Sequence, residues 1–166
     1  MLRIATWASA HSDDGVAFVQ EAERLGVHSV WSAEAWGFDA LTPLAFLAAK
    51  TETIKLGTGI VQLGARTPAN LAMAAASMQA LSDGRFLLGL GTSGPQVMEG
   101  LHGVSFTKTL QRTRETIDIV KLALSGERVR YDGDVYTLPI PDGPGRAIRL
   151  AAPPASVPIY IASLVP

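Results

Sequence analysis

Glu34 lies at a position in the sequence where acid–base chemistry could occur. It lies in the segment Ser32-Ala33-Glu34-Ala35-Trp36-Gly37, directly after a β-rich run, so a carboxylate stands beside an indole. A carboxylate there can accept a hydrogen bond from a cofactor or relay a proton. The alternatives are an ion pair between Glu34 and an Arg of a neighbouring strand, and a Trp36 that only covers the core. His11 and His102 fall on loops at the same ends of predicted strands and are further candidates for general acids.

A glycine-rich motif follows another β-rich run. Gly89-Leu90-Gly91-Thr92-Ser93-Gly94 matches the dinucleotide-binding pattern G-x-G-x-x-G. That pattern requires a helix that opens at its third glycine, whereas Pro95, Gly100 and Gly103 interrupt the next residues. We therefore favour a strand end at which glycines let the backbone pass close to a ligand and offer N–H groups to an anion. A plain surface loop is the alternative.

Two glycines also interrupt a third β-rich run, in Gly57-Thr58-Gly59-Ile60-Val61. Glycine inside a strand indicates a bulge or the close approach of another group. A flat ring stacked at this place would explain both residues. The three histidines, at positions 11, 28 and 102, do not share the spacing of metal ligands, so we expect no metal site.

The composition narrows the function further. The chain has 14 Lys and Arg against 15 Asp and Glu, 48% apolar residues and no cysteine. Near-neutral charge without a basic run does not favour nucleic acid or an anionic membrane as a partner. The absence of cysteine excludes disulfides and thiolate chemistry, so redox chemistry would need a bound cofactor. No apolar run reaches the about 18 residues of a membrane span, and we expect a cytoplasmic protein that acts on a small molecule.

The elements that must position these residues repeat along the chain. The first four β-rich runs begin 26 to 31 residues apart, close to the length of one strand and its returning helix. The strands that we predict are Leu2–Trp7, His28–Glu34, Ile54–Gln62, Arg85–Thr92 and Val157–Ser163. The helices between them are predicted at about Asp13–Leu25, Pro43–Lys50 and Pro68–Leu81, with Ser12, Thr42 and Thr67 as their N-caps and Gly26 and Ser82-Asp83-Gly84 as two of their ends.

The rhythm breaks after Thr92. A glycine-rich segment runs to Phe106, and a helix is predicted near Leu110–Leu124. A hairpin with strands at about Val129–Tyr131 and Val135–Leu138 follows, around the turn Asp132-Gly133-Asp134. Six prolines between positions 139 and 158 predict a loop, so residues at about 126–156 form an excursion from the repeat.

Five parallel strands with four crossovers fit a part of a (β/α)8 TIM barrel, which takes about 250 residues when complete. We therefore predict an α/β fold in which residues 1–166 are the N-terminal part of one barrel domain. A doubly wound open sheet is the alternative, because strand spacing alone does not separate the two. An open arc leaves one sheet edge unpaired, and open edges invite association, so we expect a homo-oligomer, a dimer.

Several segments together resemble the luciferase-like monooxygenase superfamily, and within it the oxidoreductases that depend on the deazaflavin coenzyme F420. The resemblance spans nearly the whole chain but only the N-terminal half of the family's barrel. The segments that carry it are Ser29 to Gly37, Leu56-Gly57-Thr58-Gly59-Ile60, Arg66-Thr67-Pro68, Ser82-Asp83-Gly84-Arg85-Phe86 and Gly89 to Gly103 with Ser93-Gly94-Pro95-Gln96.

The resemblance implies a coenzyme in the mouth of the barrel, its ring against a bulge in the third strand that often contains a cis non-proline peptide. Gly59-Ile60 matches that position. The residues that would bind coenzyme F420, or FMN as the alternative, are Glu34, Gly59, Ile60, Gly91, Thr92, Ser93, Gly94, Gln96 and Ala162. Glu34 and His11 are the catalytic candidates. Several members carry histidine after the acidic residue, where this chain has Ala35, so that histidine cannot be carried over.

Three functions remain open at this point. The first is an oxidoreductase that moves a hydride between coenzyme F420 and a small organic substrate. The second keeps the fold but uses FMN and oxygen, as a luciferase-like monooxygenase. The third is a truncated half-barrel that has the fold and no turnover.

Overall fold

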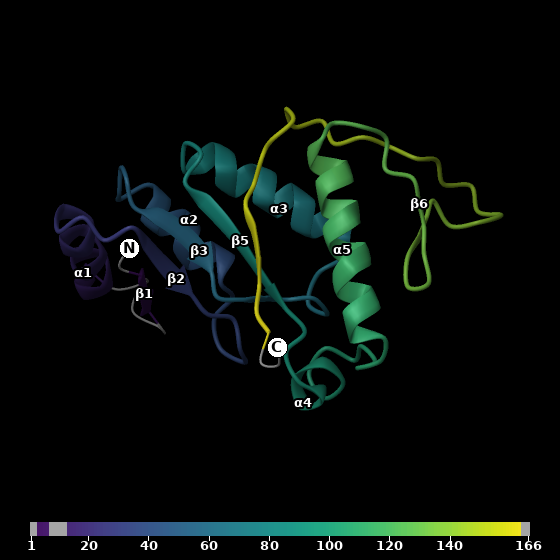
Figure 1. The fold of residues 1–166 in the computed structure, drawn as a ribbon, viewed down its shortest axis with the longest axis horizontal. Helices are drawn as coiled ribbons and strands as arrows, with labels where there is room; N and C mark the ends of the chain where they lie inside the picture. Colours follow the sequence, from purple (N-terminus) through teal and green to yellow (C-terminus); the bar gives the residue numbers. More distant parts are fainter. Residues whose placement is uncertain (1–2, 7–12, 164–166) are drawn as a thin grey trace. The chain divides into compact units, whose positions relative to one another are not determined.

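The computed structural model describes residues 3–6 and 13–163, which form two compact units (Figure 1). The first unit takes in the chain up to Gln62, Ser77–Gly91 and the chain from Val157 onward. The second unit consists of Leu63–Ala76 and Thr92–Ser156. The predicted excursion at about 126–156 therefore belongs to the second unit.

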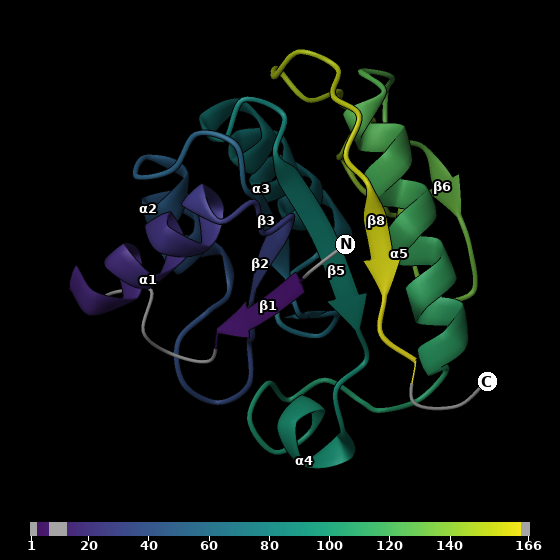
Figure 2. The same cartoon turned by 60° about the vertical axis from the view of Figure 1, so that its left-hand side comes forward.

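All parallel strands of the described chain lie in the first unit, side by side (Figure 2). They are β1 (Arg3–Thr6), β2 (Ser29–Ser32), β3 (Lys55–Thr58), β4 (Val61–Gln62), β5 (Phe86–Gly91) and β8 (Ile159–Ile161). Neighbouring strands follow the order β1-β2-β3-β5, and β8 then pairs with β5 in parallel. This is the chain order that we predicted for a barrel. It excludes the doubly wound alternative, in which the first strand lies between later ones.

The predicted strand over Ile54–Gln62 is divided into β3 and β4. Gly57 pairs with Leu87, and Val61 pairs with Leu90. The chain thus advances four residues on one strand, from 57 to 61, against three on β5, from 87 to 90. One extra residue on one side defines a β-bulge, so the predicted bulge is confirmed. The prediction of one unbroken strand over Ile54–Gln62 was wrong.

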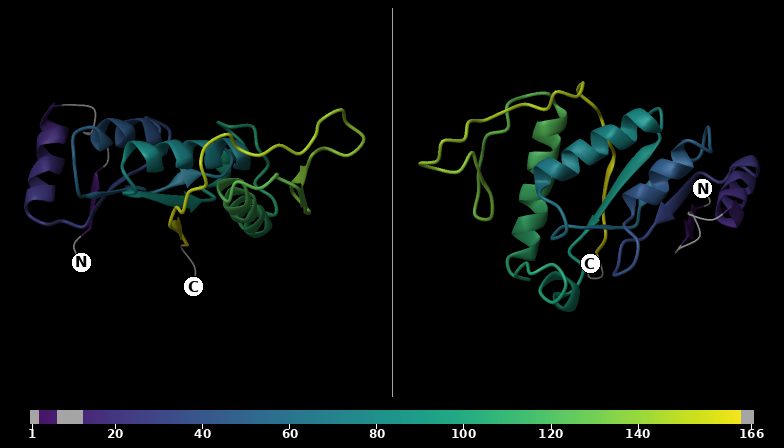
Figure 3. Two further views of the ribbon diagram at one scale, coloured as in Figure 1. Left: turned by 90° about the horizontal axis from the view of Figure 1, so that it is seen from above. Right: turned by 180° about the vertical axis from the view of Figure 1, so that it is seen from behind.

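The core of the first unit lies between the sheet and its helices. Leu44 and Leu47 of α2 (Leu41–Ala48) are fully buried, as are Leu56 and Leu88 of the strands. α2 runs along one face of the sheet (Figure 3, left). Alternate strand residues point to opposite faces. The remaining strand positions therefore form the other face, where the candidate site lies.

The helix ends follow the predicted signals with one exception. α1 (Asp13–Arg24) ends at Gly26, whose φ of 76° suits glycine and whose N–H donates to the Glu23 carbonyl at 2.9 Å. α2 begins at Leu41, before the predicted start at Pro43. The Asp39 carboxylate accepts hydrogen bonds from the N–H groups of Leu41 and Thr42. An acceptor three residues upstream replaced the expected Thr42 cap.

The third helix agrees with its prediction. α3 (Pro68–Leu81) begins after Thr67, whose Oγ1 accepts a hydrogen bond of 3.2 Å from the Asn70 N–H. It ends where Asp83 and Gly84 both take positive φ. The predicted cap at Ser12 lies outside the described residues.

The second unit contains the irregular part of the chain. α5 (Thr109–Leu124) and the antiparallel hairpin of β6 (Tyr131–Asp132) and β7 (Thr137–Leu138) were predicted, although the strands are shorter than expected. The segment expected to be irregular up to Phe106 also contains a short helix, α4 (Pro95–Met98). The proline-rich segment after β7 is an extended loop without helix or strand (Figure 3).

Candidate functional site

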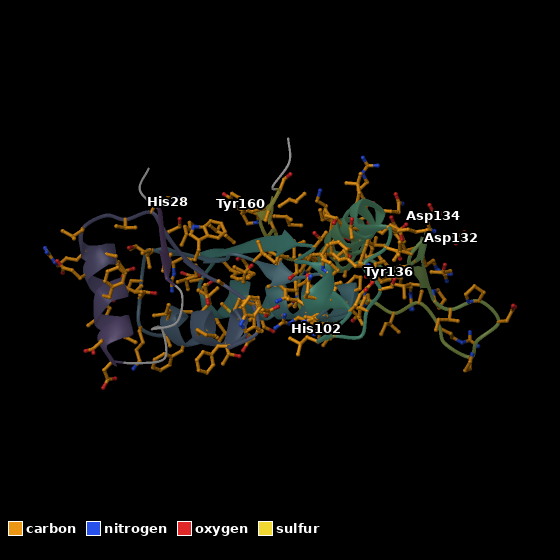
Figure 4. All side chains as sticks on the ribbon, turned by 90° about the horizontal axis from the view of Figure 1, so that it is seen from below. His28, His102, Asp132, Asp134, Tyr136 and Tyr160 are labelled. Carbon is orange, nitrogen blue, oxygen red and sulfur yellow. The ribbon has the colours of Figure 1, made fainter. Side chains whose placement is uncertain are left out.

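The indole of Trp31 covers the glycines of the face opposite α2. A Cβ on Gly57 would overlap the indole ring, and a Cβ on Gly89 would lie 3.5 Å from its Cζ3. The Tyr160 ring packs edge-on against the indole, with centroids 5.2 Å apart and an interplanar angle of 80°. These four residues, from β2, β3, β5 and β8, define what we call the glycine face. Figure 4 shows Tyr160 on the side of the sheet away from α2.

The flat ring predicted above Gly57 is therefore a side chain of the protein itself. The notion that a bound ring explains this glycine is wrong, because the Trp31 indole takes that space. Gly89 is explained by the backbone, since a Cβ there would overlap the Thr58 carbonyl oxygen. The Thr58 hydroxyl also donates to the Gly89 carbonyl at 2.9 Å and accepts from its N–H at 2.8 Å.

Glu34 and Gln62 join the loop after β2 to β4. The Glu34 carboxylate accepts hydrogen bonds from the Ala40 N–H at 3.2 Å and the Gln62 N–H at 3.1 Å. In return, the Gln62 side-chain amide donates to the carbonyls of Glu34, at 3.1 Å, and Ala35, at 2.7 Å. We name this arrangement the Glu34–Gln62 clamp. Sequence reasoning did not single out Gln62, because its only signal is an amide within an apolar strand.

Ile60, Gly91 and Ala162 meet at the carboxyl ends of the strands. A Cβ on Gly91 would lie 2.9 Å from the Ile60 side chain and 3.6 Å from the Ala162 Cβ. The Ala162 N–H donates to the Leu90 carbonyl at 2.9 Å. The Gly59–Ile60 peptide is cis, as the resemblance implied. The first unit thus brings together five of the predicted cofactor-binding residues, namely Glu34, Gly59, Ile60, Gly91 and Ala162.

The other predicted cofactor-binding residues, Thr92, Ser93, Gly94 and Gln96, belong to the second unit. The Gly94 carbonyl accepts from the N–H groups of Val97 and Met98 and so opens α4. Ser93 precedes it with a φ of 58°. That these residues and the first-unit cluster form one cleft stays a prediction.

Of the two candidate histidines, one lies among the described residues and the other does not. His11 lies outside the described residues. His102 follows α4, and its backbone N–H donates to the Val97 carbonyl at 3.1 Å. A proton-transfer role for either residue stays a prediction.

Two aromatic side chains of the loop after β2 are exposed. Trp36 is 78% exposed and Phe38 is 64% exposed. The alternative in which Trp36 covers the core is therefore wrong.

Neither a metal cluster nor a membrane span is present in the described parts of the chain. No group of three or more His, Asp or Glu residues in 3–6 and 13–163 could hold a metal ion. No helix within the same residues is long and apolar enough to cross a bilayer.

Comparison with known proteins establishes the family. The family model of the luciferase-like monooxygenases matches residues 3–166, so the chain belongs to that family. A candidate coenzyme F420-dependent oxidoreductase of Mycobacterium tuberculosis is 43% identical over 96% of this chain and 48% of its own length. The chain thus spans about half the length of the curated relatives that it matches.

Solved structures show the same fold. The coenzyme F420-dependent tetrahydromethanopterin reductase of Methanopyrus kandleri superposes with a TM-score of 0.79 at 22% identity, over 96% of this chain and 49% of that one. A type II Baeyer–Villiger monooxygenase of Pseudomonas putida, in complex with FMN, superposes with a TM-score of 0.73 at 21% identity, over 93% and 46%. The predicted fold class, a part of a (β/α)8 TIM barrel, is confirmed.

Proposed function

We propose that this chain is part of an oxidoreductase that moves a hydride between coenzyme F420 and a small organic substrate. The observation that carries the proposal is the 43% identity, over nearly the whole chain, to a relative named for coenzyme F420. The position of the cis Gly59–Ile60 peptide agrees with the resemblance on which the cofactor-binding residues were predicted.

The residues at the strand ends suit a flat, uncharged ring. Gly59, Ile60, Gly91 and Ala162 offer only hydrogen, methyl and alkyl groups there. Thr92, Ser93 and Gln96 would supply hydroxyl and amide groups to the polar part of the coenzyme. A bound deazaflavin supplies the carbon that gives or takes the hydride, whereas the protein supplies position and electrostatics.

Glu34 is proposed to hold the loop after β2 in place at the mouth of the barrel. That loop would then contact the coenzyme. The Glu34 carboxylate oxygens accept two backbone hydrogen bonds, from Ala40 and Gln62, which fix the carboxylate in place. His11 is proposed as the proton donor, since general-acid catalysis needs a group that titrates near neutral pH.

The test is a titration of the purified chain with coenzyme F420 and, separately, with FMN, followed by equilibrium dialysis. The proposal expects F420 to bind more tightly than FMN. It also expects a substrate of an F420-dependent relative, such as the glucose 6-phosphate for which a dehydrogenase 35% identical to this chain is named, to bleach the visible absorbance of the F420-loaded protein. Tighter binding of FMN would favour the monooxygenase alternative, which the Baeyer–Villiger fold neighbour supports. Binding of neither cofactor would contradict the proposal and leave the non-catalytic half-barrel.

A further inference from the structure

The glycine face contains one ring whose position is fixed from several sides. The Trp31 indole N–H donates to the Ser29 Oγ at 2.9 Å, which sets the rotation of the ring. Gly57 leaves room for the ring on one side, and Tyr160 packs against it edge-on at 5.2 Å. A tryptophan held by a hydrogen bond, a glycine and a second ring keeps one rotamer and offers a fixed surface.

That ring reaches the proposed cofactor position. From the Cβ site of Gly59, the Trp31 Cβ is 3.5 Å away and its ring Cε3 is 3.8 Å away, which are ordinary van der Waals contacts. Gly59 is the residue directly before Ile60. A group that packs on Gly59 from the glycine face therefore contacts the Trp31 indole, because Gly57 and Gly89 have no side chain to lie between them.

We propose that Trp31 is a positioning residue of the cofactor site, the wall that limits how deeply a flat ring enters from the strand ends. This inference rests on the proposed function. The glycines at 57, 59 and 89 leave the space above them free of their own side chains, so the indole that lies on them sets the depth of the site. Removing the indole would open a ring-sized space below the site and let a bound ring tilt or sink.

The experiment compares three variants of the full chain, titrated with coenzyme F420 and with FMN while tryptophan emission is recorded. Trp31→Ala is expected to weaken binding by about tenfold, the size of a lost aromatic contact. Trp31→Phe keeps an aromatic wall and is expected to stay within about threefold of the unsubstituted chain. Trp36→Phe is the matched control, because Trp36 is 78% exposed and is not one of the four residues that define the glycine face.

Emission adds a signature that a purely structural role would not produce. A ring bound against Trp31 quenches its emission on contact. The quenched share of total emission should fall in Trp31→Phe. It should fall less in Trp36→Phe, which removes an exposed tryptophan of the loop after β2 and leaves Trp31 in place. This comparison needs only conservative variants, so it decides the matter should Trp31→Ala fail to fold, as judged by circular dichroism.

The outcomes separate this inference from the proposed function. Unchanged affinity in a folded Trp31→Ala, or full quenching that survives in Trp31→Phe, overturns the role of Trp31 and leaves the proposed function standing. Failure of the unsubstituted chain to bind F420 or FMN overturns the proposed function and the role of Trp31 with it. Weaker binding in Trp31→Ala together with the shift in quenching supports both.

Discussion

Gln62 shows how much of the mouth depends on one buried amide. Its side chain is buried and donates to two carbonyls of the loop after β2. In Gln62→Leu both carbonyls lose their donor while their burial is kept, and we expect a loss of about 1–3 kcal/mol in the free energy of unfolding. Urea denaturation followed by circular dichroism measures it. Gln20→Leu is the control, because that amide makes its hydrogen bond to the Lys50 carbonyl on the exposed surface, and a loss of equal size there would contradict the prediction.

Arg85 plays a comparable part at the opposite ends of the strands. Its buried guanidinium donates to the carbonyls of Ser82, Ile54, Ala48 and Thr51 and to the Thr51 hydroxyl, so it caps the end of α2. Lysine has three donors on a flexible stem and cannot reproduce this planar set.

We therefore expect Arg85→Lys to lower the free energy of unfolding by about 2–4 kcal/mol, since several buried carbonyls are left without a donor. Thermal denaturation measures the change. The exposed Arg24, which pairs with Glu21 on one helix face, gives the control Arg24→Lys. A melting temperature of Arg85→Lys equal to that of the control would show that the guanidinium is replaceable.

For single residues, the sequence indicated which positions matter more reliably than which residues they contact. Glycines within the third strand correctly predicted that something approaches Gly57, but the partner, Trp31, comes from another strand 26 positions earlier. Likewise, a carboxylate at 34 was evident, whereas its bond to the Gln62 backbone depends on the bulge that sets the register of β4. Contacts of this kind follow from the paired sheet and cannot be found from local patterns.

The helix α5 and the hairpin of β6 and β7 are joined by one carboxylate. Glu115 is buried and accepts hydrogen bonds from the backbone N–H groups of Asp134, Val135 and Tyr136 and from the Gln111 side chain. Burial opposes its ionisation, yet these four hydrogen bonds outweigh it and hold the pKa of Glu115 below its ordinary value. The hairpin turn is thus fixed to the helix by charge.

This arrangement predicts a dependence of stability on pH. Because the pKa is lower in the folded state, Glu115 adds stability above its unfolded pKa of about 4.3, and that stability is lost as the pH falls through the lower folded value. Glu115→Gln should lower the free energy of unfolding at neutral pH and flatten its decline in acid. Denaturation from pH 7 downward tests this, with Glu127→Gln, on the loop after α5, as the control. Parallel pH curves for Glu115→Gln and the unsubstituted chain would refute it.

Element boundaries were predicted where the signal was local and missed where a neighbour decided. Thr67 with Pro68 opened α3 as expected. The similar pair at Thr42 and Pro43 did not open α2, because Asp39 lies close enough to bond the N–H groups of Leu41 and Thr42. The same dipeptide therefore begins a helix at Thr67-Pro68 but not at Thr42-Pro43, where the Asp39 carboxylate takes the capping role.

The order of the whole sheet was predictable because the repeat length leaves few ways to connect parallel strands. The division of the described chain into two units was not predictable, since it depends on how the excursion at about 126–156 packs with α5. Within the first unit the six strands form an open arc. In the described residues β8 pairs with β5 alone and β1 with β2 alone.

An open arc of this kind predicts that the 166-residue chain associates with itself. Free strand edges expose unpaired N–H and C=O groups, and barrels remove such edges only by closure. Ile161, on β8, is 55% exposed and adds apolar surface to that edge. A lysine there would repel a second edge while leaving the pairing of β8 with β5 in place.

We expect light scattering to show dimers or larger species for the unsubstituted chain and a shift toward monomer, by about tenfold in dissociation constant, for Ile161→Lys. Ile148→Lys is the matched control, because Ile148 is 71% exposed but belongs to the proline-rich loop of the second unit and not to a strand. If association runs through the sheet edge, the control keeps the mass of the unsubstituted chain. A monomeric unsubstituted chain, or equal dissociation by both lysines, would mean that the edge of β8 does not drive assembly.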